Sequence, residues 1–390
     1  MEQSLRTSRD LVVDKSVLST STYISRKVTN RCKNIKKSDD RNTLNVFPNV
    51  DDIRNIFFFR NKRISSCVGD DDFNDKLSNE LILLIFKWLP KKDLVQCTMV
   101  CKRWHEITYN EILWKNLDLY RKTLKEITLQ QILSRGVRIL RLAQAKIITS
   151  VIQEMNVRCD NDCTYKLQYL DLSMAMILPD NLASLLSKCK DLKKLSLESC
   201  TLNAACCKEL SYCTKLEVLN LAMCEGIDLK GILDILKLRS LIELNVAWCS
   251  LDKESVTILC KMLPPTITRL NISGCREVII DYDIEELIRS CPNIIELDLS
   301  DCSVLTDKTI LNILNLTKLE HLSLSRSYNI STLSYSELER MPRMEYLDIF
   351  SLLPKSVPNK LKINKFLFSS IARPTIGNQS GTIWGFRVRN

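Results

Sequence analysis

Few side chains in this sequence have the types and spacing that enzyme chemistry requires. The chain has 390 residues, and its two histidines, His105 and His321, exclude an HExxH zinc site and leave few options for a Ser-His-Asp triad. One G-x4-G pair, Gly226 and Gly231, precedes Ile-Leu instead of the Lys-Ser/Thr of a phosphate-binding loop. Cys101 lies near His105, which is the one pairing open to a thioester-forming cysteine outside the repeats described below. We therefore predict that the protein is not an enzyme and needs no cofactor.

Cysteine is abundant, with 17 residues in the chain. Cys159 and Cys163 are four positions apart and Cys206 and Cys207 are adjacent, but neither histidines nor a second pair complete a zinc site, so no metal centre is predicted. The N-terminal residues contain no apolar stretch after a basic end, which argues against a secretory signal. We expect a reducing compartment and thiols that serve as core residues.

The charge of +10 is concentrated at the two ends of the chain. Residues 1–63 and residues 351–390 each carry a net charge of +7, so the body between them carries −4. We expect residues 1–72 to be a disordered basic region. Within it, Arg26–Lys37 has the composition of a nuclear localisation patch, with a solvated linker as the alternative, and Arg41-x-x-Leu44 has the form of a destruction box. The expected localisation is nucleus and cytoplasm.

The sequence argues against two classes of partner, membranes and nucleic acids. The longest apolar run, Leu81–Phe86, is far shorter than the ~20 residues of a membrane-spanning helix. The basic ends lack interleaved aromatic residues and any known nucleic-acid-binding module. We therefore expect no membrane partner and no nucleic-acid partner.

One phrase recurs along the second half of the chain. From Leu167 onward, eight variants of L-x-x-L-x-L-x-x-C appear, among them LKKLSLESC, LEVLNLAMC and IIELDLSDC. The third apolar position recurs every 24 to 27 residues from Leu172 to Ile349, and a degenerate copy, Leu140-Arg141-Leu142, lies 30 residues before Leu172. This period indicates leucine-rich repeats, and the terminal cysteine is typical of their cysteine-containing subtype.

Each repeat is predicted to be one short strand followed by one helix. The x-L-x-L part alternates, so its leucines point inward, and the segments between the strands have apolar residues at helical spacing. Stacked units bury a continuous core, which predicts an α/β solenoid over 121–350. A column of cysteines is expected to point into this core at the ends of the strands: Cys200, Cys224, Cys249, Cys275 and Cys302.

Two further columns are expected on the concave face. The column between the strand leucines is small and polar, as on a solvated sheet face: Asp171, Ser196, Asn220, Asn245, Asn271, Asp298, Ser323 and Asp348. The column two residues after the last strand leucine contains Met174, Ser199, Met223, Trp248, Gly274, Asp301 and Arg326. Exposed Trp and Arg are residue types that anchor interfaces, so we expect Trp248, Asp301 and Arg326, joined by Arg276, to form a binding lip.

Residues 73–120 have a different pattern, with three apolar segments at helical spacing. Leu81, Leu84, Ile85 and Trp88 lie on one face of the first predicted helix, and Pro90 separates it from the second. Asp93 is expected to cap the second helix, which would run through Val100. So small a module makes a poor core alone, which favours docking to a partner.

This segment resembles an F-box, the module that binds the adaptor of SCF (adaptor–cullin–F-box) ubiquitin ligases. One departure is Ser78, where that family usually has proline. The resemblance implies an adaptor-binding role for the following residues: Leu77, Leu81, Ile85, Phe86, Leu89, Leu94, Val100, Cys101, Trp104 and Trp114. An F-box followed by leucine-rich repeats resembles an SCF substrate receptor, which performs no catalysis itself.

The C-terminal sequence IARPTIGNQSGTIWGFRVRN, at 371–390, resembles the tail of one group of these receptors, the S-phase kinase-associated protein 2 family. The resemblance implies that the tail, 351–390, folds back along the concave face. It also implies a CKS-type accessory subunit, a phosphorylated cyclin-dependent-kinase (CDK) inhibitor as substrate, and contacts to both through Trp248, Arg276, Asp301 and Arg326. Three alternatives stay open: an F-box receptor for another substrate, a leucine-rich-repeat scaffold outside any ligase, and a catalytic ligase.

Overall fold

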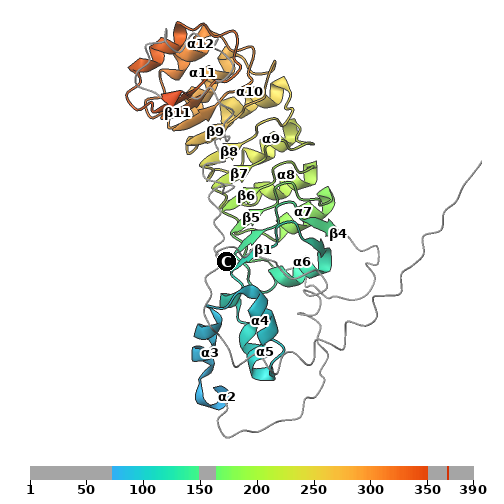
Figure 1. Ribbon diagram of the computed structural model, residues 1–390. Helices are drawn as coiled ribbons and strands as arrows, with labels where there is room; N and C mark the ends of the chain where they lie inside the picture. Colours follow the sequence, from blue (N-terminus) through green and yellow to red (C-terminus); the bar gives the residue numbers. More distant parts are fainter. Residues whose placement is uncertain (1–72, 149–163, 350–366, 369–390) are drawn as a thin grey trace, which may run out of the picture. The chain divides into compact units, whose positions relative to one another are not determined.

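The structure is a computed structural model that describes residues 73–148, 164–349 and 367–368. The expectations for 1–72, with the localisation patch and the destruction box, lie outside these residues. The same holds for the tail, apart from two residues. The predicted fold class is confirmed: a small helical module precedes a solenoid of parallel strands and helices (Figure 1).

The helical module consists of short helices, and side chains cap the starts of three of them. The helices are α2 (Phe73–Lys76), α3 (Asn79–Phe86), α4 (Lys91–Cys97), α5 (Lys102–Thr108) and the 3-10 helix η1 (Glu111–Leu113). Ser78 caps α3, because its hydroxyl accepts a hydrogen bond from the Leu81 amide at 3.5 Å. This contact gives the serine that stands in place of the usual proline a structural role of its own.

The expectation for the second helix was wrong at both ends. Helix α4 begins at Lys91, directly after Pro90, and ends at Cys97 rather than Val100. Asp93 therefore lies in the first turn instead of at the cap, where its negative charge still faces the positive end of the helix dipole. Pro90 takes the cap position because proline has no N–H that a helix start would leave unsatisfied.

The solenoid is built on a parallel sheet of eleven strands. Its strands, in spatial order, are β1 (Asn116–Asp118), β3 (Ile139–Arg141), β5 (Tyr169–Asp171), β6 (Lys194–Ser196), β7 (Val218–Asn220), β8 (Glu243–Asn245), β9 (Arg269–Asn271), β10 (Glu296–Asp298), β11 (His321–Ser323), β12 (Tyr346–Asp348) and β13 (Leu367–Phe368). Strands β2 (Thr123–Lys125) and β4 (Lys146–Ile148) form a second, two-stranded sheet. The degenerate copy at Leu140 is thus a true repeat, and Leu117 adds one that the sequence pattern missed.

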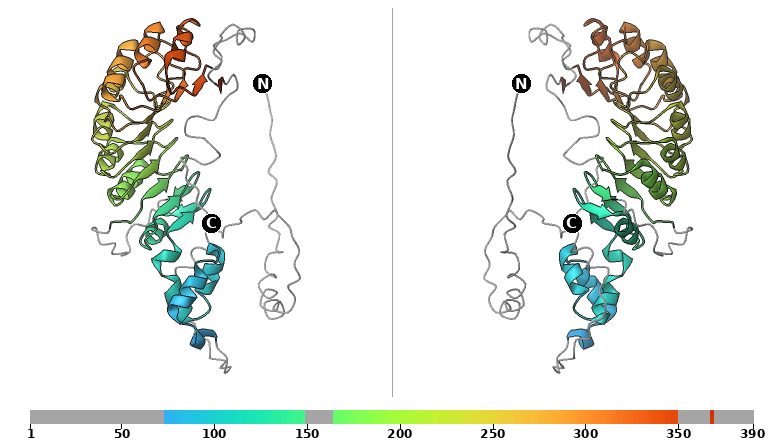
Figure 2. Two further views of the ribbon diagram at one scale, coloured as in Figure 1. Left: turned by 90° about the vertical axis from the view of Figure 1, so that its left-hand side faces the viewer. Right: turned by 90° about the vertical axis from the view of Figure 1, so that its right-hand side faces the viewer.

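A helix follows most strands and lies on the convex side of the sheet, while the strands line the concave side (Figure 2). These helices are α6 (Glu126–Leu133), α7 (Pro179–Ser187), α8 (Ala204–Ser211), α9 (Leu229–Ile235), α10 (Lys253–Met262), α11 (Asp281–Ser290), α12 (Asp307–Ile313) and the 3-10 helix η2 (Ser334–Arg340). Several start at a capping side chain that the repeat supplies, as Asn203, Asp228 and Asp252 do for α8, α9 and α10. No helix within the described ranges is long and apolar enough to cross a bilayer.

The predicted cysteine column is buried, as expected. Four of the five thiols donate hydrogen bonds to backbone carbonyls of the preceding repeat, such as Cys224 Sγ to Leu197 O at 3.0 Å and Cys249 Sγ to Leu221 O at 2.8 Å. Burial raises the pKa of the Cys249 thiol to about 12 and that of Cys200 to about 11. At neutral pH these groups are therefore protonated core residues.

The small polar column between the strand leucines is buried and not solvated, which corrects the expectation. All eight of its members are less than 9% exposed. Five of them accept a hydrogen bond from the amide two residues later, as Asn245 Oδ1 does from Ala247 N at 3.0 Å. The polar side chains close the turn that ends each strand, so the pattern reflects a structural requirement of the backbone.

Candidate functional site

One face of α3 presents apolar side chains to solvent. Leu81, Leu84 and Ile85 are 43 to 50% exposed, and Trp88, one residue past the helix cap, is 89% exposed. The opposite face of the same helix packs into the core of the module, where Ile82 and Phe86 are buried. A contiguous apolar face of this kind on a small module is a candidate interaction surface.

The ten residues that the F-box resemblance implied fall into three groups. Leu81, Ile85 and Val100 are exposed, whereas Phe86, Leu94 and Trp114 are buried and build the core behind the surface. The other four are half-buried: Leu77, Leu89, Cys101 and Trp104. A partner that meets the module as it stands therefore touches the first group, and the buried group acts by holding that surface in place.

Trp104 connects the exposed face to the core. Its ring packs edge-on against Phe86, with the ring centroids 5.1 Å apart, and its Nε1 donates to Asn74 Oδ1 at 2.6 Å. Arg103, next to it, donates from Nη2 to Leu77 O at 2.6 Å and from Nε to Asn79 Oδ1 at 2.7 Å. These bonds fasten the chain before α3 onto α5, which fixes the orientation of the exposed face.

Sequence reasoning placed Leu84 and Trp88 on the right helix face but left them out of the implied contact residues. Met99, which is 52% exposed, was also left out. Hydrophobicity at helical spacing was a sufficient signal for the first two. Met99 follows the end of α4, and no periodicity marks its exposure.

The second candidate surface is a ridge with one residue from each repeat. Its members have φ between 56° and 63°, or 82° at the glycine: Arg121, Gln144, Met174, Ser199, Met223, Trp248, Gly274, Asp301 and Arg326. We call this set the left-handed ridge. A non-glycine residue in this conformation costs about 1 kcal/mol or more, so its recurrence requires a compensating contact in every repeat.

That contact is a backbone ladder along the ridge. From Arg121 to Asp301, each amide donates to the carbonyl that precedes the ridge residue of the next repeat, at 2.7 to 3.0 Å; Trp248 N, for instance, donates to Ser273 O at 2.9 Å. The left-handed turn points each amide at the neighbouring repeat. The ladder therefore holds one side chain per repeat in a row with a fixed direction.

Trp248 on this ridge contacts Arg276, which lies two residues after Gly274. The Arg276 guanidinium lies over the Trp248 ring, 5.1 Å from its centroid, an arrangement that favours cation–π attraction. The ring itself lies against Gly274, where a β-carbon added to the glycine would come within 2.5 Å of the indole. Glycine at this position is thus what lets the indole lie flat across the ridge.

Asp301 and Arg326 form a second pair, with Arg326 Nε 3.2 Å from Asp301 Oδ1. The aspartate side chain is 11% exposed, whereas the arginine is 48% exposed. Along the ladder, the repeat that carries Gly274 lies between this pair and Trp248. The four predicted lip residues thus form two adjacent pairs, one aromatic and cationic, the other an ion pair.

Two ridge residues, Arg121 and Gln144, were missed from the sequence. Counting two residues past Leu119 and Leu142 would have found both, because the same spacing defines the rest of the column. The early repeats deviate from the consensus phrase, and this hid the register.

The Cys101–His105 pairing offers no support for a thioester-forming site. Cys101 Sγ accepts a hydrogen bond from Trp104 N at 3.5 Å at the start of α5, and the His105 ring lies against Tyr109, with centroids 4.7 Å apart. The two side chains thus contact different neighbours. The thirteen described cysteines are free thiols, and twelve of them are buried.

Family models match most of the described chain. A model described as F-box-like matches residues 79–120, and one described as the SKP2 LRR domain matches residues 127–390. The chain belongs to the SKP2 family of F-box/leucine-rich-repeat proteins. In this family the helical module is the F-box, and the sheet with its ridge is the SKP2-type repeat domain. Such an architecture is typical of non-catalytic substrate receptors of SCF-type ubiquitin ligases.

Individual relatives are distant from this SKP2-family chain. It is 24% identical to mouse lysine-specific demethylase 2B over 257 residues, 61% of the chain and 17% of that protein. It is 25% identical to Xenopus tropicalis lysine-specific demethylase 2A over 289 residues, 72% of the chain and 21% of that protein. The chain thus spans about a fifth of the length of these curated relatives.

Solved structures with a related arrangement include the yeast Rad7 and Elc1 complex and a leucine-rich-repeat protein of Leptospira interrogans. The first is 13% identical, covers 75% of this chain and 93% of the matched chain, and has a TM-score of 0.42. The second is 20% identical, covers 66% and 67%, and also has a TM-score of 0.42. Since both scores are below 0.5, the family assignment rests on the family models alone.

Proposed function

We propose that this protein is the substrate-recognition subunit of an SCF E3 ubiquitin ligase. The observation that carries the proposal is the presence of an F-box and an SKP2-type repeat domain on one chain. The F-box binds the adaptor through the exposed face of α3 and, through the adaptor, the cullin and RING subunits. The protein itself performs no chemical step.

Such a receptor acts by raising the effective concentration of substrate lysines near a charged ubiquitin-conjugating enzyme. This task requires two surfaces held on one scaffold. The exposed apolar face around Trp88 and the left-handed ridge meet this requirement, since neither is consumed by the core.

The finer proposal names the substrate: phosphorylated CDK inhibitors, bound together with a CKS-type accessory subunit that supplies the phosphate pocket. Their ubiquitination and proteasomal degradation would place the protein at the G1/S transition of the cell cycle, in the nucleus and cytoplasm. The Trp248–Arg276 and Asp301–Arg326 pairs support this reading, because Trp and Arg are frequent interface anchors. The basic tail, with seven Lys/Arg and no acid in 351–390, would add positive potential for an anionic substrate.

One titration tests both levels of the proposal. The chain is purified with its adaptor, and a labelled CDK-inhibitor peptide is added, phosphorylated or not, with and without a CKS subunit. We expect binding that needs both the phosphate and the CKS subunit. Adaptor binding without peptide binding would point to a receptor for another substrate. Failure to bind the adaptor would favour a repeat scaffold outside any ligase.

A charge reversal on the ridge locates the accessory contact. Asp301→Arg removes the carboxylate that holds Arg326 and places two cations together, so CKS binding should weaken at least tenfold while adaptor binding stays intact. The matched control is Glu254→Arg, the same charge change at an exposed position of α10 on the convex side. Loss of adaptor binding in the Asp301 variant would instead indicate misfolding.

A further inference from the structure

The junction between the F-box and the repeat domain has no role in the proposed function so far. The apolar core runs through it without a break, by way of Leu113, Trp114 and Leu117. Apolar contact is non-directional, so it holds the two parts together without fixing the angle between them. Beside this core lies a cavity of about 690 Å³ whose lining includes residues of both parts, such as Tyr109 and Lys166. The angle therefore depends on the polar contacts that cross the junction.

The first of these contacts is made by Arg135, which follows the last turn of α6. Its guanidinium carbon lies 4.2 Å from the centroid of the Tyr109 ring and 5.7 Å from that of the Trp114 ring. Both rings belong to the F-box, whereas Arg135 belongs to the repeat domain. A planar guanidinium over aromatic faces combines stacking with cation–π attraction, and both depend on orientation.

The backbones on both sides of this stack are held in place. On the F-box side, Trp114 is buried and its Nε1 donates to Thr108 O at 2.6 Å. On the repeat side, Arg135 N donates to Ile132 O at 3.2 Å, and Gly136, with a φ of 80°, turns the chain out of the helix. The stack thus joins two fixed segments, and a rotation of one against the other breaks it.

A second contact crosses the junction at the surface. Lys166 Nζ lies 2.7 Å from Glu111 Oε2, but the two side chains are 60% and 43% exposed. An exposed ion pair of this kind stabilises little. Gly136 leaves room for it, because a β-carbon there would come within 2.6 Å of Glu111 Oε2. The half-buried Arg135 is therefore the stronger of the two contacts.

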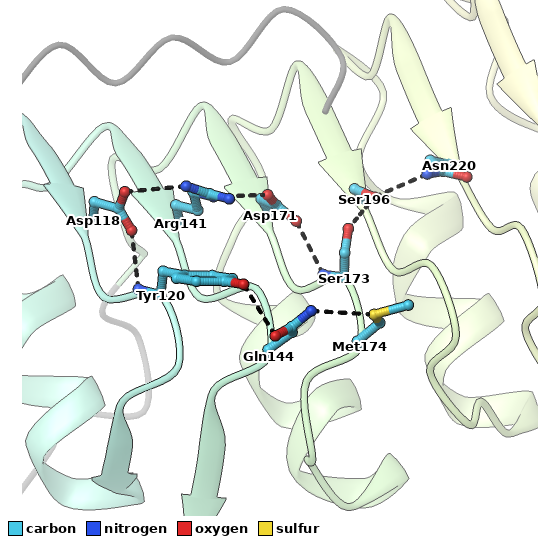
Figure 3. A network of polar contacts seen from close by, with 9 residues as sticks. All are labelled: Asp118, Tyr120, Arg141, Gln144, Asp171, Ser173, Met174, Ser196 and Asn220. Atoms are coloured by element: carbon cyan, nitrogen blue, oxygen red, sulfur yellow. Dashed lines mark hydrogen bonds and ion pairs between the residues drawn. The ribbon is translucent and has the colours of Figure 1, made fainter. Parts of the chain in front are cut away.

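The repeats behind the junction form a stiff unit. Figure 3 shows a line of polar contacts that crosses five neighbouring strands: β1, β3, β5, β6 and β7. At its start, Arg141 Nη1 lies 3.3 Å from Asp118 Oδ2, and Arg141 Nε lies 3.6 Å from Asp171 Oδ2. Hydrogen bonds of 2.8 to 3.1 Å continue the line through three further residues: Ser173, Ser196 and Asn220. An angle set at the junction is therefore carried into the middle of the solenoid.

We propose that Arg135 is a positioning residue for ubiquitin transfer. Its stack on Tyr109 and Trp114 sets the angle between the F-box and the repeats, and so selects the substrate lysines that reach the conjugating enzyme. In the transfer, a lysine amine attacks the thioester carbonyl of ubiquitin, an isopeptide bond replaces the thioester bond, and the released cysteine of the conjugating enzyme takes the amine proton. This inference rests on the proposed receptor function and adds a residue that contacts neither adaptor nor substrate.

The length of the solenoid amplifies a small change at the junction. The six strand steps from β3 to β10 cover up to about 29 Å, so a tilt of about 10° at the junction displaces the repeat of Asp301 by up to about 5 Å. A misplacement of about 1 Å can already slow a reaction between positioned groups about a hundredfold. A loosened junction therefore spreads transfer over more lysines, while the substrate site itself stays intact.

The test follows ubiquitin transfer by the reconstituted ligase, with adaptor, cullin, RING and CKS subunits, to a phosphorylated CDK inhibitor. We expect Arg135→Ala to lower the fraction of ubiquitin on the preferred lysine about threefold with KM unchanged, as mass spectrometry of the product and initial rates measure. Tyr109→Ala should cause the same change, and the double variant no more, because both break one contact. Arg239→Ala, exposed at the same position of a later repeat, is the matched control and should keep the wild-type pattern.

A distance measurement tests the angle without any substrate. Spin labels are attached through non-natural amino acids at two exposed lysines, Lys92 in α4 and Lys208 in α8, of the chain bound to its adaptor. Arg135→Ala should widen the distribution of label distances about twofold, because small contacts between domains leave relative motion possible. Arg239→Ala should leave the distribution as narrow as in the wild type.

The outcomes separate this inference from the proposed function. If the wild type transfers ubiquitin and Arg135→Ala leaves either the lysine pattern or the distance distribution unchanged, the inference is overturned while the proposed function stands. If the wild type transfers no ubiquitin, the proposed substrate and this inference both fall. Should Arg135→Ala lose adaptor binding through misfolding, Tyr109→Ala decides in its place.

Discussion

The F-box and the repeat domain separate folding from binding in different ways. In the F-box, Ile82 and Phe86 build the core from the same two turns of α3 that present Leu81 and Ile85 to solvent. In the repeats, the strand leucines are buried in every unit, and the ridge positions, two residues further on, are exposed at Met174, Met223 and Arg326 and half-buried at others such as Trp248. In the helix, core residues and contact residues alternate within each turn of 3.6 residues. In the repeats, core residues and ridge residues occupy separate positions of the repeating unit.

This difference predicts unequal tolerance to substitution. A change on α3 risks both stability and docking, because neighbouring side chains serve different tasks within one turn. A change on the ridge leaves the leucine and cysteine columns untouched, since the ladder uses only backbone atoms there. The repeat domain is therefore the region in which specificity can vary at low cost to the fold.

The largest effect should follow from breaking a core column. Leu244→Ala, at a position that is 1% exposed in β8, removes a fully packed side chain and should lower the free energy of unfolding by about 3 kcal/mol. Denaturant unfolding followed by circular dichroism measures this. Met223→Ala on the neighbouring ridge is the control and should change stability by less than about 0.5 kcal/mol. Equal losses for both variants would contradict the separation of columns.

The second effect separates surface from support within the F-box. Trp88→Ala should leave the melting temperature almost unchanged but weaken adaptor binding by at least about 2 kcal/mol, or about thirtyfold, as an exposed aromatic anchor does. Trp104→Ala should lower both stability and binding, because it removes the Phe86 contact and the bond to Asn74. Calorimetric titration with the adaptor measures the binding of both variants, and thermal unfolding measures their stability. Normal binding by a folded Trp88 variant would show that α3 is not the docking face.

A third, smaller effect tests the buried polar column. Asn245→Ala removes the acceptor for the Ala247 amide and should cost about 1 to 2 kcal/mol of stability. Asn245→Asp keeps an oxygen at the same place, and the column already contains Asp171 and Asp298, so it should cost less. Thermal unfolding of the two variants gives the comparison. If the alanine variant is as stable as the wild type, the hydrogen bond from Asn245 to the turn does not stabilise the fold.

The smallest effect concerns pH. Burial raises the pKa of Asp171 above its ordinary value, so the folded state prefers the protonated acid. Its contribution to stability is therefore fully present below the ordinary aspartate pKa and is lost as pH rises through the raised folded value. Asp171→Asn should therefore make the free energy of unfolding less dependent on pH. At neutral pH it should change that free energy by about 1 kcal/mol or less. Denaturation curves between pH 4 and 8 measure it, and an unchanged slope would assign the pH dependence elsewhere.

Most of the fold could be predicted from the sequence, because the repeat phrase fixes strand, helix and core together. Leu170 and Cys200 needed only their place in the phrase to be assigned to the core. The polar column was misjudged because alternation in a strand suggests a solvated face, whereas Asn245 and its equivalents bond to the turn that follows. Sequence patterns state which side of a strand a residue occupies, but not what lies against it.

The candidate site was predictable in composition but not in detail. The ridge column followed from counting, yet its left-handed conformation did not, since Met, Trp and Arg rarely adopt it. The pairing of Trp248 with Arg276 also depends on Gly274, whose importance appears only once the indole is seen to lie against it. In the F-box, pattern matching gave the family but mixed Phe86 and Trp114, which are buried, with Leu81, which is exposed.

The buried thiols make the reversibility of unfolding depend on the surroundings. Eleven of the twelve buried cysteines among the described residues lie in the solenoid, where they are shielded while it is closed, and burial keeps the pKa of those in the repeat column high. An opened chain exposes many thiols at once, with pKa values near the usual 8.5, and any oxidant can then join them into non-native disulfides. In a reducing medium the chain can refold, but without reductant each opening is a one-way event, so the lifetime of the protein becomes a rate set by how often the repeats open.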